Sequence, residues 1–368
     1  MRSSPLKTQL AAAGAIHRER HGVEIVSHLG DLRAECRAVR EAAALSDFSF
    51  LRVFSLPENP GMDVLDALLA GNVPKIRFGR ILHTFLADQE GQLAADCYVA
   101  NNDQEFVFLC ESIRPDAELD ALLAASGFAA AARDLSADHV VLSLDGFKSW
   151  EIVKKLFGAD VLGLPYLSIE NYSFAGTPIR FIRAGKTSEF GYLLLAPAGI
   201  AAQLFAALKT EVEALGGQLA GLDAHDALRL EGRFFNIFRE GERVRDPLPL
   251  GLQWMIDFEK DPFLGGEAIK QRRAAGVKQK VIGLSAEAGC GDLKTGAKIY
   301  SAGQPVGEVV ADGFSQVLNQ PLALGLFPVQ LAFAGLPFQI NSPDGPAIRS
   351  ISMPPIMPRS LTVKLDEM

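Results

Sequence analysis

The pattern of predicted helices and strands changes near residue 278, and this change constrains the fold more than any other feature. Between residues 31 and 270, helical segments alternate with short strands. Residues 81–112, ILHTFLADQEGQLAADCYVANNDQEFVFLCES, are typical of three strands joined by DQEG and NNDQ turns, an antiparallel meander. Beyond residue 278, short glycine-rich strands such as those in AKIYSAGQPVGEVVADGFSQ indicate an all-β barrel or sandwich. We therefore predict an α+β chain of two or three domains, since 368 residues exceed what one core usually supports.

A carboxylate stands in the middle of the second strand of the meander. In GQLAADCYVANN, period-two alternation places Leu93, Ala95, Cys97 and Val99 on one face and Ala94, Asp96 and Tyr98 on the other. An aspartate in a strand more often faces water or caps a turn. If this second face points inward, Asp96 is buried and must be paired, hydrogen-bonded or neutral, which is a frequent property of functional sites.

Composition and motifs exclude several classes of function. The net charge of −8 argues against a nucleic-acid partner, since neutralising phosphates needs a basic face. The N-terminal apolar run is too short to span a membrane, so we expect a cytoplasmic protein without a membrane partner. No C-x-x-C pair or H-E-x-x-H motif occurs, so we expect no metal site. Neither a dinucleotide fingerprint, nor a P-loop, nor a G-x-S-x-G elbow is present.

The densest cluster of polar residues begins at residue 221, in GLDAHDALRLEG. Its helical spacing places His225 and Arg229 one turn apart, so that both could face a cavity. On spacing alone, a surface helix whose salt bridges use Asp226, Arg229 and Glu231 is equally compatible.

Several segments resemble, in the same order along the chain, the T protein of the glycine cleavage system and its aminomethyltransferase superfamily. They are RAVREAAALSDFSF, GQLAAD, RAGKTSEFGYLLL, GLDAHDALRLE, RDPLPLGLQWMIDFEKDPFLGGEAI and GEVVADGFSQVL. The resemblance covers about residues 30 to 340. It implies a three-domain cloverleaf around a central channel, with a discontinuous first domain (1–54 and 145–270), a second domain (55–144) and a C-terminal β-barrel (278–368). It also implies that tetrahydrofolate binds in the channel and that Asp96 is the catalytic acid beside the reacting nitrogens.

The chain departs from this family at the positions expected to bind the pterin. The family's paired acids are here Ala95 and Asp96, and the glutamate that reads the pterin ring corresponds to Leu193. An unpaired polar ring edge costs about 1 to 3 kcal/mol, so Leu193 would weaken folate binding unless another acceptor, such as Glu189, compensates.

The donor side of the cavity also differs. Lys186 and His225 replace a family tyrosine and arginine, His83 stands where an aromatic residue is expected, and Ala100 replaces a tyrosine. A desolvated Lys186 could pair with a substrate carboxylate or with Asp96, although an exposed strand-end lysine is equally compatible. The histidines could act as acid or base, but histidines are more often structural. Further candidates for the cavity wall are Arg229, Tyr192 and Trp254, the last two more simply explained by packing.

These features predict a one-carbon transferase that has diverged from the ordinary glycine-cleavage enzyme. It would move a methyl or methylene group from a small, acidic N-, O- or S-substituted donor to N5 of tetrahydrofolate. The altered cavity argues against a lipoyl carrier protein as partner. One alternative is an enzyme that has lost folate and acts on another small ligand. Another is a non-catalytic folate-binding accessory protein, although the Lys-Gly-Cys-Tyr-x-Gly-Gln-Glu signature of the superfamily's iron–sulfur assembly factors is absent.

Overall fold

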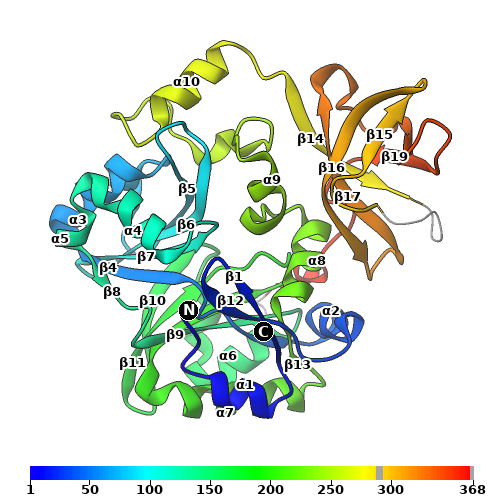
Figure 1. Ribbon diagram of the computed structural model, residues 1–368. Helices are drawn as coiled ribbons and strands as arrows, with labels where there is room; N and C mark the ends of the chain where they lie inside the picture. The colour runs from blue at the N-terminus through cyan, green and yellow to red at the C-terminus, as the bar shows by residue number, and fades with distance from the viewer. Residues whose placement is uncertain (287–292, 365–368) are drawn as a thin grey trace.

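The computed structural model describes residues 1–286 and 293–364. Its strands form a six-stranded sheet, a five-stranded sheet, a closed barrel and a short hairpin. In Figure 1 the six-stranded sheet lies at the bottom, the five-stranded sheet at the upper left and the barrel at the upper right, with α8 (Leu222–Gly232) and α9 (Glu242–Val244) between them. The predicted α+β class with a C-terminal β-barrel is confirmed.

The six-stranded sheet joins segments from both ends of the first 220 residues. Its order is β10 (Ser168–Phe174), β11 (Thr177–Arg183), β12 (Gly191–Pro197), β9 (His139–Asp145), β3 (Ala44–Asp47) and β13 (Gln218–Leu219). The helices of this part are α1 (Lys7–Ala12), α2 (Leu32–Glu41), α6 (Ser149–Phe157) and α7 (Ala198–Ala214). The hairpin of β1 (Ile16–Arg20) and β2 (Val23–His28) precedes them.

The five-stranded sheet contains the predicted meander. Its order is β5 (Ile81–Ala87), β6 (Leu93–Asn102), β7 (Glu105–Ser112), β4 (Arg52–Pro57) and β8 (Arg133–Asp134). Helices α3 (Glu58–Leu68), α4 (Asp116–Leu123) and α5 (Phe128–Ala131) belong to the same part of the chain. The predicted division into three domains stays a prediction, and β9 pairs in the six-stranded sheet although residues 139–144 were assigned to the second domain.

The barrel follows α10 (Gly266–Ala274) and closes in the order β14 (Gln279–Ser285), β17 (Gln320–Pro328), β16 (Gln304–Ser315), β15 (Lys298–Ser301), β18 (Pro337–Ile340) and β19 (Ala347–Ile351). The first and last strands are themselves paired, which leaves no open edge in this sheet. After β19 the chain returns to the six-stranded sheet through the 3₁₀ turn η7 (Arg359–Thr362), whose Ser360 binds the loop before β12.

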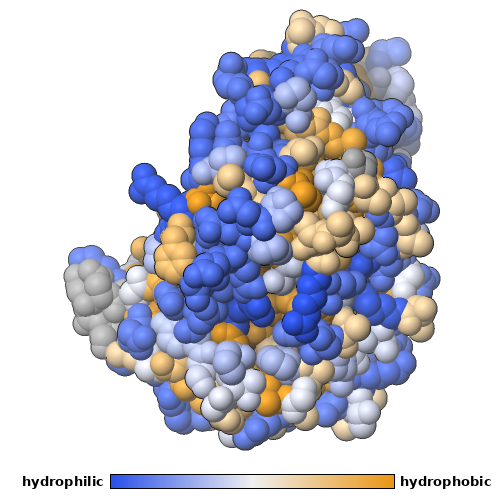
Figure 2. Space-filling view, turned by 90° about the vertical axis from the view of Figure 1, so that its left-hand side faces the viewer, coloured by the Kyte–Doolittle hydropathy of each residue, from blue (hydrophilic) through white to orange (hydrophobic). Residues whose placement is uncertain are grey.

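Most apolar side chains are inside. Figure 2 shows a face that is largely hydrophilic, with apolar residues exposed singly or in small groups, as is usual for globular proteins. No helix in residues 1–286 and 293–364 is long and apolar enough to cross a membrane.

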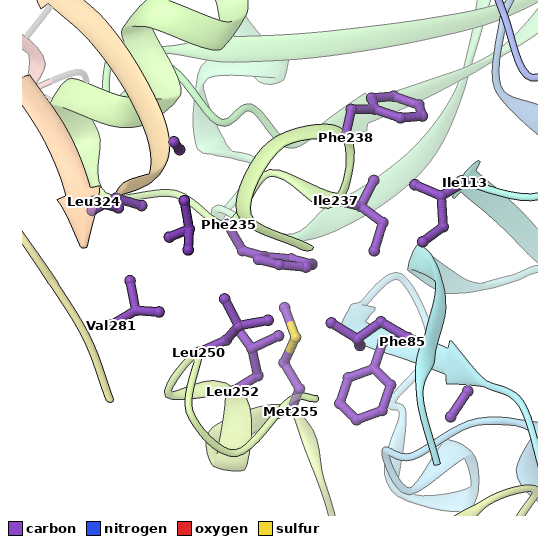
Figure 3. Packing of buried hydrophobic residues seen from close by; sticks show 14 of the residues in the cluster. Phe85, Ile113, Phe235, Ile237, Phe238, Leu250, Leu252, Met255, Val281 and Leu324 are labelled. Atoms are coloured by element: carbon purple, nitrogen blue, oxygen red, sulfur yellow. The ribbon is translucent and has the colours of Figure 1, made fainter. Parts of the chain in front are cut away.

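A central hydrophobic cluster joins the five-stranded sheet, the segment that follows α8, and the barrel. Figure 3 shows Phe235, Leu250 and Met255, which belong to the central segment (residues 235–256), lying between Phe85 of the five-stranded sheet and Val281 of the barrel. All five side chains are at least nine-tenths buried. Because the central segment shares one core with the five-stranded sheet and with the barrel, burial of apolar area in this cluster stabilises their packing against one another.

A second cluster lies between the two sheets. Tyr98 and Leu109 of the five-stranded sheet and Val141, Leu193 and Leu195 of the six-stranded sheet belong to it. The faces of β6 and β7 that carry Tyr98 and Leu109 therefore point toward the six-stranded sheet. Polar residues on these same faces end up buried between two sheets.

Candidate functional site

The β6–β7 hairpin sets two carboxylates side by side. Its turn consists of Asp103 and Gln104, both with positive φ (36° and 65°), as in a type I′ hairpin turn. This turn fixes the register so that Asp96 lies directly opposite Glu111. Both residues are buried, with 2 % and 5 % of their surface exposed. Two buried carboxylates opposite each other repel, so the arrangement needs nearby cations.

Two buried cations supply the compensating charge. Lys186 Nζ donates to Asp96 Oδ2 at 2.5 Å and to Glu111 Oε1 at 3.1 Å. Arg229 donates to both oxygens of Glu111, each at 2.8 Å. The four groups form a formally neutral cluster in which each charge faces an opposite one. We refer to Asp96, Glu111, Lys186 and Arg229 as the ion-pair cluster.

His83 completes the surroundings of Asp96. It lies opposite Tyr98 on β5, diagonal to Asp96 on the same face, and its Nε2 is 2.7 Å from Asp96 Oδ1. Burial alone would raise the pKa of Asp96, but the charges of Lys186 and His83 outweigh it and hold the pKa well below its usual range. Asp96 is therefore ionised at neutral pH. This answers the question raised by the sequence: the face that carries Asp96 is buried.

A close approach of two glycines brings Lys186 into the cluster. The loop between β11 and β12 folds so tightly that a Cβ on Gly185 would lie 2.9 Å from Cα of Gly191. Only glycine fits at such a contact. The loop thus directs Lys186 across the space between the two sheets to Asp96, and the exposed strand-end lysine is ruled out, since 7 % of Lys186 is exposed.

The ion-pair cluster forms part of the wall of a narrow cavity between the two sheets, with about 20 Å³ of space open to water-sized molecules, room for about one water. Its apolar wall consists of Phe48, Leu51, Tyr98, Leu109 and Leu193, and its polar lining, besides the cluster, of Ser143, Asp145 and His225. Helix α8 presents His225 and Arg229 to this cavity together, as the spacing predicted. Because Arg229 and Glu231 are buried, the alternative of a surface salt-bridged helix is wrong.

His225 is a neutral member of this wall. Its Nε2 is 2.8 Å from Ser46 Oγ, and its ring contacts Phe48 with centroids 4.7 Å apart. Burial, with a further contribution from the charge of Arg229, lowers its pKa to about 3. At physiological pH His225 therefore offers a hydrogen-bonding ring rather than a charge.

Four predicted site residues do not line the cavity, and one of them, His83, reaches it only through Asp96. Glu189 accepts hydrogen bonds from the backbone N–H of Ser360 (2.9 Å) and pairs with Arg40 (3.2 Å), so it fastens the C-terminal segment and does not compensate for Leu193. Tyr192 is fully buried in the core of the six-stranded sheet. Trp254 is 63 % exposed and lies edge-on to His83, with centroids 5.4 Å apart, beside a separate, more open groove.

Sequence reasoning missed Glu111 and Asp145. A signal for Glu111 existed, because a two-residue NNDQ turn pairs residue 96 with residue 111. Asp145 ends β9 next to a glycine, a position that reads equally well as a turn residue. Within residues 1–286 and 293–364, no group of three or more His, Cys, Asp or Glu side chains could hold a metal ion.

The comparisons with known proteins agree with this architecture. Residues 6–260 match the family described as the GCVT N-terminal domain. An aminomethyltransferase of Mycobacterium leprae is 31 % identical over 309 residues, covering 83 % of each chain. An aminomethyltransferase of Synechococcus sp. is 28 % identical over 334 residues, covering 89 % of this chain and 91 % of that protein. The crystal structure of glycine cleavage system aminomethyltransferase T from Bartonella henselae superposes with a TM-score of 0.82 at 21 % identity, covering 97 % of this chain and 99 % of that one.

The chain thus has the architecture of the glycine cleavage T protein. The family match spans more than half of the chain, so the protein belongs to the GCVT, or aminomethyltransferase, family. The resemblance predicted from the sequence is confirmed. An enzyme of the aminomethyltransferase kind is consistent with these relatives.

Proposed function

We propose that the protein transfers a methyl or methylene group from a small, acidic N-, O- or S-substituted donor to N5 of tetrahydrofolate. The observation that carries the proposal is Asp96: an ionised carboxylate, 2 % exposed, on the wall of a cavity between two sheets. A buried charge of this kind is costly to the fold, and perturbed charges on cavity walls are enriched at functional sites.

The side chains that line the cavity suit a reduced folate, which would have to part them on binding, because the open space holds about one water. A pterin is a flat ring with apolar faces and a polar edge. The apolar side chains Phe48, Leu51 and Leu193 offer surfaces for the faces, while Asp96 and the other polar groups of the lining offer partners for the edge. Tetrahydrofolate would supply the nucleophilic nitrogen when bound.

Each residue of the ion-pair cluster has a distinct task in this proposal. Ionised Asp96 stabilises positive charge on the group in transfer, and His83 fixes the orientation of the carboxylate. Lys186 uses two of its three N–H donors on Asp96 and Glu111, which leaves one donor for an anionic group of the donor substrate. Glu111 holds Lys186 in place and is itself held by Arg229. Correct positioning of donor and acceptor would supply much of the rate.

The test is transfer of an isotopic label. The protein is incubated with tetrahydrofolate and a panel of carboxylate-bearing donors with ¹³C-labelled methyl groups on N, O or S, and labelled folate is detected by mass spectrometry. We expect label from at least one donor and a loss of about 100-fold or more in Asp96→Asn, in line with removal of one electrostatic partner of a transition state. Asp138→Asn is the matched control, because Asp138 is exposed.

The outcomes separate the candidate functions. Turnover by Asp96→Asn within about threefold of wild type would remove the role assigned to Asp96. Folate binding without transfer from any donor would favour a non-catalytic accessory protein. A second candidate function, an enzyme that has lost folate, is favoured by Leu193, which makes the cavity wall apolar where the family has an acid. Indifference to folate would support it.

A further inference from the structure

Asp145 is a cavity carboxylate that the ion-pair cluster does not include. It is the last residue of β9 and lies opposite Gly191 of β12, while Ser143 lies opposite Leu193. Asp145 and Leu193 are therefore diagonal neighbours on one face of the six-stranded sheet. Both line the cavity, and Asp145 is 1 % exposed.

The backbone leaves room for this carboxylate. A Cβ on Gly185 would lie 3.0 Å from Asp145 Oδ1, and a Cβ on Gly191 would lie 2.9 Å from it. Any other residue at either position would push against the carboxylate. The two glycines that direct Lys186 thus also make the space in which Asp145 faces the cavity.

The partners of Asp145 are neutral hydroxyls. Ser143 Oγ donates to Oδ2, and Thr187 Oγ1 donates to Oδ1 at 3.3 Å. In the part of the chain that the structure describes, no Lys, Arg or His forms an ion pair with Asp145, and Arg229 acts on it only from a distance. By contrast, Asp96 and Glu111 each have a cation within 3.1 Å. Two of the four acceptor positions of the carboxylate remain for a ligand.

A buried carboxylate without a cation destabilises the folded chain when it is ionised. Burial raises the pKa of Asp145 to about 6, although both hydroxyls and Arg229 oppose the shift, so the group is mostly ionised at neutral pH. Folding gains nothing from this charge, whereas a ligand with N–H donors gains a strong acceptor.

We propose that Asp145 reads the edge of the ligand that carries two adjacent N–H donors, in place of the acceptor that Leu193 lacks. In tetrahydrofolate this edge consists of the 2-amino group and the neighbouring ring N–H, which match a carboxylate in a bidentate pair. The inference rests on the proposed function and names the residue that gives it its specificity for the amino-pyrimidone ring.

Calorimetry with two ligands and three proteins tests this inference. The ligands are tetrahydrofolate and its 2-desamino analogue, which lacks one of the two donors. The proteins are wild type, Asp145→Asn and the control Asp138→Asn, in the exposed turn just before the same strand. Wild type and control are expected to bind tetrahydrofolate at least tenfold more tightly than the analogue. Asp145→Asn is expected to lose at least tenfold in affinity for tetrahydrofolate and to bind the two ligands within about threefold of each other.

The comparison between ligands separates a contact from a general disturbance of the site. Asp145→Asn removes a buried charge, so we expect it to fold at least as stably as wild type at pH 7, which circular dichroism and urea unfolding check. If Asp145→Asn still discriminates between the ligands as wild type does, the inference is overturned while the proposed function stands. If wild type binds neither ligand, the proposed function and this inference both fail.

Discussion

Lys186→Met tests whether the ion-pair cluster is what keeps Asp96 ionised. The substitution keeps most of the length of the side chain, which ends one atom earlier, and removes the one cation shared by Asp96 and Glu111. Removing one partner of a buried ion pair typically costs 3 to 5 kcal/mol. Because Glu111 retains Arg229 and Asp96 retains His83, we expect a loss near the lower end, about 3 kcal/mol at pH 7.5.

The dependence on pH identifies the cause of this loss. In wild type, the pKa of Asp96 lies below its usual value of 3.8, so folded and unfolded chains are both ionised between pH 7.5 and 5, and Asp96 adds no slope there. Without Lys186, the effect of burial dominates and the pKa of Asp96 rises above 3.8. The folded variant then takes up a proton before the unfolded chain does, which stabilises it as the pH falls. The loss should therefore be smaller at pH 5 than at pH 7.5.

Urea unfolding at both pH values, followed by circular dichroism and tryptophan fluorescence, measures the two losses. Lys75→Met is the control, because Lys75 forms an ion pair with Asp257 at the surface, and we expect it to cost at most about 1 kcal/mol at either pH. An equal loss for Lys186→Met at pH 5 and pH 7.5 would refute the reasoning, since it would mean that the charge of Asp96 does not depend on Lys186.

Two further predictions concern residues around the cavity. Burial lowers the pKa of His225 from 6.5 to about 3, so between these pH values the unfolded chain binds a proton that the folded chain excludes. The free energy of unfolding therefore falls on acidification by up to about 1.4 kcal/mol per pH unit. The difference in unfolding free energy between His225→Gln and wild type should shift in favour of the variant from pH 7 to pH 5, and a constant difference would argue against a buried neutral ring. Glu189→Gln should weaken the attachment of the C-terminal segment at Ser360 and lower the free energy of unfolding. The cost should stay at about 1 to 3 kcal/mol, because Arg40 keeps its pair with Glu231. Limited proteolysis followed by mass spectrometry should show faster cleavage near residues 359–362, and an unchanged cleavage rate would show that Glu189 does not fasten this segment.

Local patterns predicted much of the fold. The DQEG and NNDQ turns gave the meander, since turn residues and period-two alternation act over only a few positions. The glycine-rich texture beyond residue 278 corresponds to the closed barrel. In each case the information lies within about ten residues.

The site was harder to predict because its parts come from different sheets. Asp96 and Lys186 are 90 residues apart and meet only because β6 and β12 face each other. Loop 184–190 has no regular period, so the sequence did not indicate that Lys186 points into the cavity while Glu189 turns toward the C-terminal segment. The register of the six-stranded sheet, which pairs Asp145 with Gly191, places Asp145 at the cavity, and this register could not be predicted from the local sequence. Long-range register was the missing information.

The most direct test of the central claim is a calorimetric titration of the wild-type protein with tetrahydrofolate, followed in parallel by tryptophan fluorescence. Trp254 contacts His83, which bonds Asp96, so a ligand at Asp96 should change its emission. The account predicts one binding site per chain with a dissociation constant in the range of about 1 to 100 μM, corresponding to about 5 to 8 kcal/mol. No heat and no change in emission at millimolar tetrahydrofolate would contradict it, and would mean that the cavity serves another ligand.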